Sequence, residues 1–277
     1  MMNYQIALES PSGDSRAVAL PLSALDGGKG GTLTGDEGGG IVTAILTAAG
    51  AGERLGAQLP KALVEVAGRP MFLWAVDNLL ASGGVDTLII TCPAEHRASF
   101  REALSQHYPS SSKWELVVGG ATRQASIANA LAALPTAIEI VLVHDAARPF
   151  ASPDLIARVI AAVQSGHPAV IPGVPVTDTI KRVASASHGS ALEPTSTSET
   201  VIATIPRHDL RAVQTPQGFR REVLERAYQA AHHVATDDAG LVEALGEPVL
   251  VIPGEASAMK ITTPTDLAYA ELMAPQY

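Results

Sequence analysis

Short apolar runs alternate with helical patterns along the chain from Val42 onward. The apolar runs are bounded by turn residues and have the length of buried strands. Between them, apolar residues recur at the spacing of a helix that packs one face on a sheet. This pattern predicts strands at 42–47, 86–91, 114–118, 139–145, 169–174 and 248–253, and helices at 71–82, 95–107, 122–134 and 153–166.

Three of these helices have favourable starts at Pro70, Thr122 and Ser152-Pro153, since proline and hydroxyl residues suit the first positions of a helix. Near-continuous apolar strands that alternate with helices predict an α/β fold. We expect a Rossmann-like, mainly parallel sheet with helices on both faces. Right-handed crossovers then place the loops that follow the strands along one edge, where such sheets bind ligands.

The alternation breaks at 176–207, where the β-prone runs DTIKRV and ETVIATI flank a middle rich in Ser, Ala, Gly and Pro. This predicts a projecting β-hairpin arm with a long tip, and a disordered insertion is the alternative. Beyond the arm, the pattern predicts helices at 219–231 and 236–245 and a last helix from Pro264 to about Met273, and AMKIT reads as a late strand.

The charge and cysteine content of the chain limit the kinds of molecule that it is expected to bind. The 277 residues include 19 Lys plus Arg against 28 Asp plus Glu, a net charge of −9. This argues against a general nucleic-acid or anionic-membrane surface, though a local cationic cluster can still bind an anionic substrate. The single Cys92 excludes an intramolecular disulfide framework and a multi-cysteine metal site, and favours a cytoplasmic protein. We see no apolar run long enough for a transmembrane helix and no secretory pattern.

The first part of the chain is different in character. Its segment SALDGGKGGTLTGDEGGG is Gly-rich and mostly polar, which is typical of a flexible linker or tail. We therefore expect a flexible extension at 1–39 and a folded domain at 40–277.

A glycine-rich stretch, TAAGAGERLGAQLPK, follows the first predicted strand. It fits neither the dinucleotide fingerprint nor the Walker P-loop, because Gly56 falls at the wrong distance and no Lys-Ser/Thr pair follows. Its backbone N–H groups can still line phosphate oxygens, with Arg54 and Lys61 adding positive charge. The alternative is an ordinary strand-to-helix turn with two solvated basic residues.

Several separated motifs carry a family resemblance. They are AAGAGERLG…PK, GGATRQASIANAL, VHDAARPF, PVTDTIKR, TPQGF, TDDAGLVEALG and MKITTPTDL. In this order and spacing the chain resembles the 2-C-methyl-D-erythritol 4-phosphate cytidylyltransferases of non-mevalonate isoprenoid biosynthesis. The resemblance implies transfer of CMP from CTP to that polyol phosphate, which gives 4-diphosphocytidyl-2-C-methyl-D-erythritol and pyrophosphate.

The resemblance also implies roles for particular residues. Arg54, Lys61, Arg207 and Lys260 become candidate catalytic residues that orient the reactants and neutralise charge. The candidates for nucleotide binding are Ala48, Ala49, Gly50, Gly52, Gly119, Gly120, Ser126 and Asp145. Ala121 departs from the family pattern, which commonly has an acidic residue there, and so removes one expected contact to the base.

For the polyol phosphate, the resemblance implies binding by Arg148, Thr179, Arg207 and Lys260. An arm that supplies residues to a neighbouring subunit makes a homodimer the expected assembly. A Mg²⁺ ion is expected to be held mainly by the triphosphate of CTP, with no compact protein carboxylate cluster to bind it.

Four other polar features have simpler interpretations. Asp237-Asp238 suits a helix N-cap with an acidic first turn rather than a metal ligand. His144 is expected to pack or hydrogen-bond locally, because no nucleophile lies nearby in the sequence. Asp145 and Arg148 could alternatively form a structural ion pair, and Asp209 and Arg211 look like ordinary surface charges.

Other functions remain open at this point. One is a cytidylyltransferase for another polyol phosphate, such as ribitol 5-phosphate, and another is a catalytically silent nucleotide-binding homologue. A dehydrogenase is disfavoured by the glycine spacing.

Overall fold

The structure is a computed structural model that describes residues 40–50, 59–109, 113–184, 199–231 and 235–274. All of them lie in one compact unit, Gly31–Tyr277. The predicted extension at 1–39 lies outside the described residues, so its predicted boundary stays a prediction.

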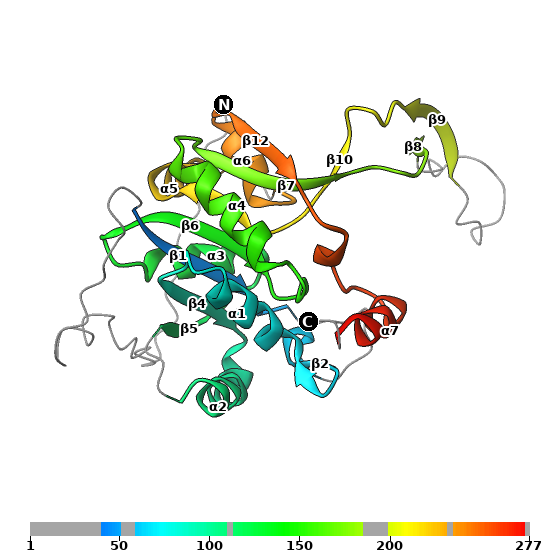
Figure 1. The fold of residues 1–277 in the computed structure, drawn as a ribbon. Helices are drawn as coiled ribbons and strands as arrows, with labels where there is room; N and C mark the ends of the chain where they lie inside the picture. Colours follow the sequence, from blue (N-terminus) through cyan, green and yellow to red (C-terminus); the bar gives the residue numbers. More distant parts are fainter. Residues whose placement is uncertain (1–39, 51–58, 110–112, 185–198, 232–234, 275–277) are drawn as a thin grey trace, which may run out of the picture. The chain divides into compact units, whose positions relative to one another are not determined.

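An eight-stranded sheet forms the centre of the described chain (Figure 1). Its parallel part has the order β6-β1-β4-β5, and β12 pairs in parallel with β7. β11 pairs antiparallel with both β6 and β7, and β10 pairs antiparallel with β7. The strands are β1 (Ile41–Thr47), β4 (Thr87–Cys92), β5 (Trp114–Val118), β6 (Ile138–Asp145), β7 (Ala169–Pro175), β10 (Arg211–Val213), β11 (Gln217–Arg220) and β12 (Val249–Pro253).

Helices cover both faces of the sheet, as the apolar pattern predicts. Successive strand residues point to opposite faces, so Leu46 of β1 packs in one core and Ile45 in the other. The first face is covered by α1 (Met71–Ala81), α2 (Arg97–His107) and α4 (Pro153–Gln164). The second face is covered by α3 (Arg123–Ala132), α5 (Arg221–Ala230) and α6 (Asp238–Ala244).

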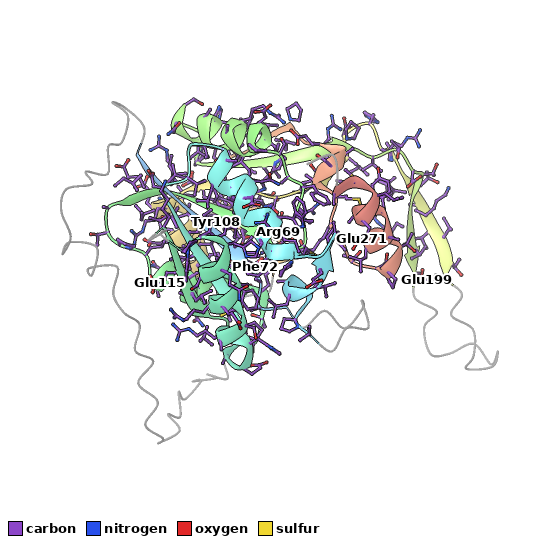
Figure 2. All side chains as sticks on the ribbon, turned by 60° about the horizontal axis from the view of Figure 1, so that its bottom comes forward. Arg69, Phe72, Tyr108, Glu115, Glu199 and Glu271 are labelled. Carbon is purple, nitrogen blue, oxygen red and sulfur yellow. The ribbon has the colours of Figure 1, made fainter. Side chains whose placement is uncertain are left out.

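A third apolar cluster joins the C-terminal helix α7 (Pro264–Met273) to the antiparallel pair β2 (Glu65–Val66) and β3 (Arg69–Pro70). Glu271, labelled on α7 in Figure 2, accepts a hydrogen bond of 2.8 Å from the backbone N–H of Ala67 in the turn between these strands. Ala67 and Gly68 both have positive φ, which suits a tight antiparallel turn. The C-terminal helix therefore fixes a turn about 200 residues upstream.

The predicted arm is an antiparallel hairpin of β8 (Ile180–Ala184) and β9 (Thr200–Ile205). These two strands pair with each other and, among the described strands, with no other. Figure 1 shows the hairpin apart from the central sheet, connected to it by the continuations of β7 and β10. The predicted tip falls on 185–198, outside the described residues.

Two predictions of local structure are wrong. The helix predicted from residue 219 begins at Arg221, because Gln217–Arg220 form β11, where buried Phe219 packs in the core of the second face. The AMKIT segment is not a strand. Ala256–Ala258 form a 3₁₀ turn, η5, and the following backbone is held instead by a 2.8 Å bond from Ile261 N–H to the carbonyl of Ala147.

Candidate active site

A cavity of about 340 Å³ lies at the carboxyl ends of β1, β4 and β6. The chain proceeds from β1 to β4 and β5 on one side, whereas β6 joins β1 on the other, so the strand order reverses here. Open α/β sheets bind their ligands at such switch points. The cavity is lined by Thr47, Ala48, Ala49, Gly50, Lys61, Ala62, Thr91, Gly120, Ala121, Thr122, Arg123, Ser126, Asp145, Ala146, Ala147 and Lys260.

The floor of the cavity is made of strand ends that are fastened to one another. Thr47 and Asp145 are register partners on β1 and β6, and the Thr47 hydroxyl donates to the Asp145 carboxylate at 3.2 Å. Just past the strands, Ala48 N–H donates to Thr91 O at 3.1 Å and Ala146 N–H to Thr47 O at 3.2 Å. The backbone hydrogen bonding between the strands therefore continues into the residues that form the cavity floor.

The two glycines in the turn before α3 leave no room for a side chain. A Cβ at Gly119 would lie 2.4 Å from the Cβ of Ala49, and one at Gly120 would lie 2.5 Å from that of Ala125. The Ser126 hydroxyl accepts from Gly120 N–H at 3.0 Å and can donate to Thr122 O at 2.9 Å. The predicted base-binding residues thus form one rigid turn against the Ala48–Gly50 loop. Gly120 and Ser126 line the cavity, and Gly119 supports it from behind.

Asp145 is the charged centre of the site. Its side chain is 10% exposed, and its carboxylate contacts Lys260 Nζ at 2.7 Å and Arg123 Nε at 3.3 Å. Burial alone would raise the pKa of Asp145, but the charges of Arg123 and Lys260 outweigh burial and hold that pKa well below its usual range. Asp145 is therefore an ionised hydrogen-bond acceptor at neutral pH.

Arg123 is a site residue that the sequence analysis missed. Its second contact is Asp238, whose carboxylate lies 2.7 Å from Arg123 Nη2. Burial opposes the charge of Arg123, but Asp238 and Asp145 raise its pKa above the usual value. The sequence does contain a signal: Arg123 is the first residue of α3, where the helix dipole disfavours a cation unless acidic partners compensate.

The two lysines predicted to be catalytic, Lys61 and Lys260, both line the cavity. Lys61 begins the 3₁₀ helix η3 (Lys61–Leu63), and its N–H donates to the carbonyl of Gly50 at 3.3 Å. Lys260 precedes Ile261, a fully buried member of the cluster formed with α7. The packing of Ile261 with α7 therefore positions the Lys260 segment, whereas the Lys61 segment is held by Gly50 and by Ala62, which is buried in the core of the first face.

His144 and Arg148 are held by local hydrogen bonds. The His144 ring contacts the Thr215 hydroxyl at 2.9 Å and the carbonyl of Arg148 at 3.2 Å. Burial lowers the pKa of His144 to about 4, so the ring is neutral at pH 7, as expected of a packing residue. Arg148 donates to the carbonyls of Ala258 at 2.7 Å and Val213 at 3.2 Å. It lies outside the cavity lining and supports the segment that leads to Lys260.

Thr179 and Arg207 lie away from this cavity. Both are exposed at the base of the β8–β9 hairpin, where Arg207 donates to the carbonyl of Thr177. Of the predicted grouping of Thr179, Arg207 and Lys260, Lys260 alone is in the described cavity lining. Gly52 and Arg54 lie outside the described residues, so their roles stay predictions.

The site offers little to a metal ion. Asp145 is the one carboxylate in the described lining, and both its oxygens already contact cations. In the described part of the chain, no group of three or more His, Cys, Asp or Glu side chains is arranged to hold a metal. Asp237 instead caps α6 by accepting from Gly240 N–H at 3.0 Å, as predicted. These residues do not fit a metal ion resident in the protein.

No helix in the described ranges combines the length and apolar character needed to cross a membrane.

Comparisons with known proteins show the family of the chain. Residues 42–276 match the family model of 2-C-methyl-D-erythritol 4-phosphate cytidylyltransferase (IspD). The chain is 48% identical over 237 residues to the protein of that name from Rhodococcus opacus, covering 86% of this chain and 96% of the relative.

Solved structures give the same result. The enzyme of that name from Thermus thermophilus is 36% identical with a TM-score of 0.65, covering 85% of this chain and 99% of the other. A 4-diphosphocytidyl-2C-methyl-D-erythritol synthase from Anaerococcus prevotii is 29% identical with a TM-score of 0.70 and the same two coverages. The chain therefore belongs to the 2-C-methyl-D-erythritol 4-phosphate cytidylyltransferase family.

Proposed function

We propose that the cavity between β1 and β6 transfers CMP from CTP to 2-C-methyl-D-erythritol 4-phosphate, the reaction for which the family is named. One observation supports this proposal above all. Lys61, Lys260 and Asp145 line the same cavity as the glycine turn that precedes α3, and this cavity lies where the strand order of the sheet reverses. Membership of the family supplies the identity of the substrates.

CTP binds with its base against the turn at Gly119–Gly120. The Ser126 hydroxyl accepts from Gly120 N–H and can donate its proton to Thr122 O. Its remaining lone pair can accept from the exocyclic amino group of cytosine, which uracil lacks. Asp145, ionised and acceptor-only, receives a ribose hydroxyl, and the backbone of Ala48–Gly50 faces the phosphates.

In the reaction an oxygen of the polyol phosphate attacks the α-phosphorus of CTP. A new P–O bond forms, the bond from the α-phosphorus to the bridging oxygen breaks, and pyrophosphate leaves with that electron pair. Because several anions meet, the protein acts mainly by positioning and charge neutralisation. Lys61 and Lys260 stabilise the charge that grows on the α-phosphate and the leaving oxygen. Arg54, next to this loop in sequence, has the same proposed role.

Mg²⁺ enters with CTP as part of the substrate. The described residues form no metal cluster, and the one cavity carboxylate, Asp145, is already paired with Arg123 and Lys260. The triphosphate oxygens are the better ligands for a hard cation. The ion then neutralises charge on the phosphates themselves.

The polyol phosphate is bound in part by a second copy of the chain. Thr179 and Arg207 stand on a hairpin that pairs with no other described strand of its own chain. On the same hairpin, Val201 and Ile202 are 53% and 59% exposed. Exposed neighbouring apolar side chains are typical of a surface that contacts another protein. In a homodimer, the hairpin of one protomer delivers Thr179 and Arg207 toward Lys260 of the other. The acidic composition and single cysteine are consistent with a cytoplasmic enzyme.

Pyrophosphate release from CTP and Mg²⁺, measured with each polyol phosphate in turn, tests the proposal. We expect release with 2-C-methyl-D-erythritol 4-phosphate and much slower release with ribitol 5-phosphate. Release with ribitol 5-phosphate alone would reassign the substrate. CTP-dependent thermal stabilisation without turnover on either compound would make the chain a silent nucleotide-binding homologue.

A further inference from the structure

Arg123 bridges two carboxylates, one at the end of strand β6 and the other at the start of helix α6. Its Nε is 3.3 Å from Asp145 Oδ1, and its Nη2 is 2.7 Å from Asp238 Oδ2. The Arg123 side chain is 32% exposed, whereas that of Asp238 is 1% exposed. The guanidinium thus contacts the buried Asp238, which is not part of the cavity lining, and Asp145, which is.

The partner behind the site is itself firmly anchored. Asp238 accepts from the Tyr228 hydroxyl at 2.5 Å. The start of α6 is also tied to β11, because Gln217 accepts from Ala239 N–H at 3.1 Å and donates to Asp237 at 2.8 Å. A buried carboxylate that is bonded at both oxygens has little freedom to move. Asp238 therefore fixes the position of the Arg123 guanidinium.

Lys260 holds Asp145 differently from Arg123. Its Nζ contacts the other oxygen, Oδ2, at 2.7 Å, and its side chain is 41% exposed. The lysine has a flexible stem and contacts this carboxylate through its ammonium group alone, so an incoming phosphate can attract it away from Asp145. Arg123 shares its charge between two carboxylates and is held by the buried one.

We propose that Arg123 is a positioning residue for Asp145, and that it keeps the carboxylate bound and directed into the cavity when Lys260 turns to a substrate phosphate. The inference rests on the proposed function of the site. Without Arg123, the departure of Lys260 would strand a buried carboxylate, so Lys260 would stay on Asp145 and be less available to the phosphate. The loss should then fall mainly on kcat and only weakly on KM for CTP.

A double-mutant cycle tests this inference. We would measure kcat and KM for CTP in the full-length wild type, Arg123→Gln, Asp145→Asn and the double variant. Arg123→Gln alone should lower kcat at least about tenfold, and in the Asp145→Asn background it should change kcat by less than about threefold. Arg226→Gln, which removes an exposed arginine paired with Glu247, is the matched control and should keep wild-type kinetics.

Two outcomes would overturn the inference: wild-type kcat in Arg123→Gln, or a full tenfold loss that persists in the Asp145→Asn background. Thermal unfolding of each variant separates this effect from misfolding. If Arg123→Gln does not fold, Arg123→Lys replaces it in the cycle, because lysine keeps the charge but cannot bridge both carboxylates.

Calorimetric titration with CTP on the same variants keeps the two proposals apart. A wild type that binds CTP but makes no product with any polyol phosphate refutes the proposed function. In that case the free energies of unfolding of the same four proteins still decide the coupling: an Arg123→Gln effect that depends on Asp145 supports it, and independence overturns it.

Discussion

Lys260 and Asp145 are separated by 115 positions in the sequence, yet Lys260 Nζ lies 2.7 Å from Asp145 Oδ2. The lysine side chain is 41% exposed, and ion pairs with an exposed partner contribute little to stability. The main effect of this ion pair is therefore to position the Lys260 side chain rather than to stabilise the fold. It holds an ammonium group at the mouth of the cavity before a phosphate arrives.

Replacing Lys260 should affect turnover far more than folding. We expect Lys260→Gln to lower kcat by about 10²–10³, the usual loss when one preorganised donor to a charged transition state is removed. The melting temperature should change little. Lys113→Gln, a charge change outside the cavity lining, is the control and should leave kcat unchanged. Equal kinetic constants for Lys260→Gln and the control would remove Lys260 from the mechanism.

The glycine turn should not tolerate a methyl group. In Gly119→Ala the new Cβ would lie 2.4 Å from that of Ala49 and 2.9 Å from Ser126 Oγ. We expect a loss of about 1–3 kcal/mol in the free energy of unfolding, measured in urea, with weaker CTP binding. Gly50→Ala is the stability control, because no atom of the described residues lies within 4 Å of its added Cβ. A Gly119→Ala protein as stable as this control would show that the turn is looser than described.

The cap of α7 should make stability depend on pH in the acid range. Hydrogen bonds from Thr262 and Thr263 lower the pKa of Asp266 from 3.8 to about 2. The folded state thus favours the charged form, so the contribution is complete above about pH 4 and is lost as the pH falls toward 2. Asp266→Asn should cost about 1 kcal/mol at pH 7. It should also flatten the stability profile between pH 4 and 2, and an unchanged slope would contradict this.

His144 should destabilise the fold over a different pH range. Burial lowers its pKa from 6.5 to about 4, so below pH 6.5 the unfolded chain takes up a proton that the folded chain resists. Stability should fall from about pH 6.5 down to 4, by up to a few kcal/mol. In His144→Gln this slope should largely disappear, whatever the absolute stability of the variant. A parallel pair of profiles would mean that other groups cause the dependence.

The hairpin should be required for dimerisation. Ile202 is 59% exposed on β9, so a charge at this position should disrupt an interface there without disturbing the core. We therefore expect Ile202→Glu to sediment as a folded monomer. Leu272, 75% exposed on α7, is the matched control, and Leu272→Glu should leave the assembly unchanged. A wild type that sediments as a monomer, or a dimer that survives Ile202→Glu, would contradict assembly through the hairpin.

Much of the fold could be predicted from the sequence, because it depends on local periodicity. The strands that end at Thr47 and Asp145 follow from apolar runs, and α4 follows from Ser152 and Pro153, which cap it. β11 could not be predicted, because its four residues gain strand structure only by pairing with β6 and β7. Such pairing is not encoded in the residues of the short strand alone.

The site was predictable in part for the same reason. Motifs at strand ends converge because parallel strands share an edge, and this brings Gly50, Gly120 and Asp145 together. Arg123 was missed because its role depends on Asp238, a partner contributed by another helix. Lys260 was placed on a strand, whereas tertiary bonds such as that from Ile261 to Ala147 hold it in an irregular segment. Contacts of this kind depend on the packed structure rather than on spacing.

The most direct test of the central claim is a phosphorus NMR time course of the purified full-length chain with CTP, Mg²⁺ and 2-C-methyl-D-erythritol 4-phosphate. We expect the polyol phosphate signal to be replaced by two coupled signals of a diphosphate diester, in step with one equivalent of pyrophosphate. Release of CMP with the polyol phosphate unchanged, or no reaction while CTP still binds, would contradict it.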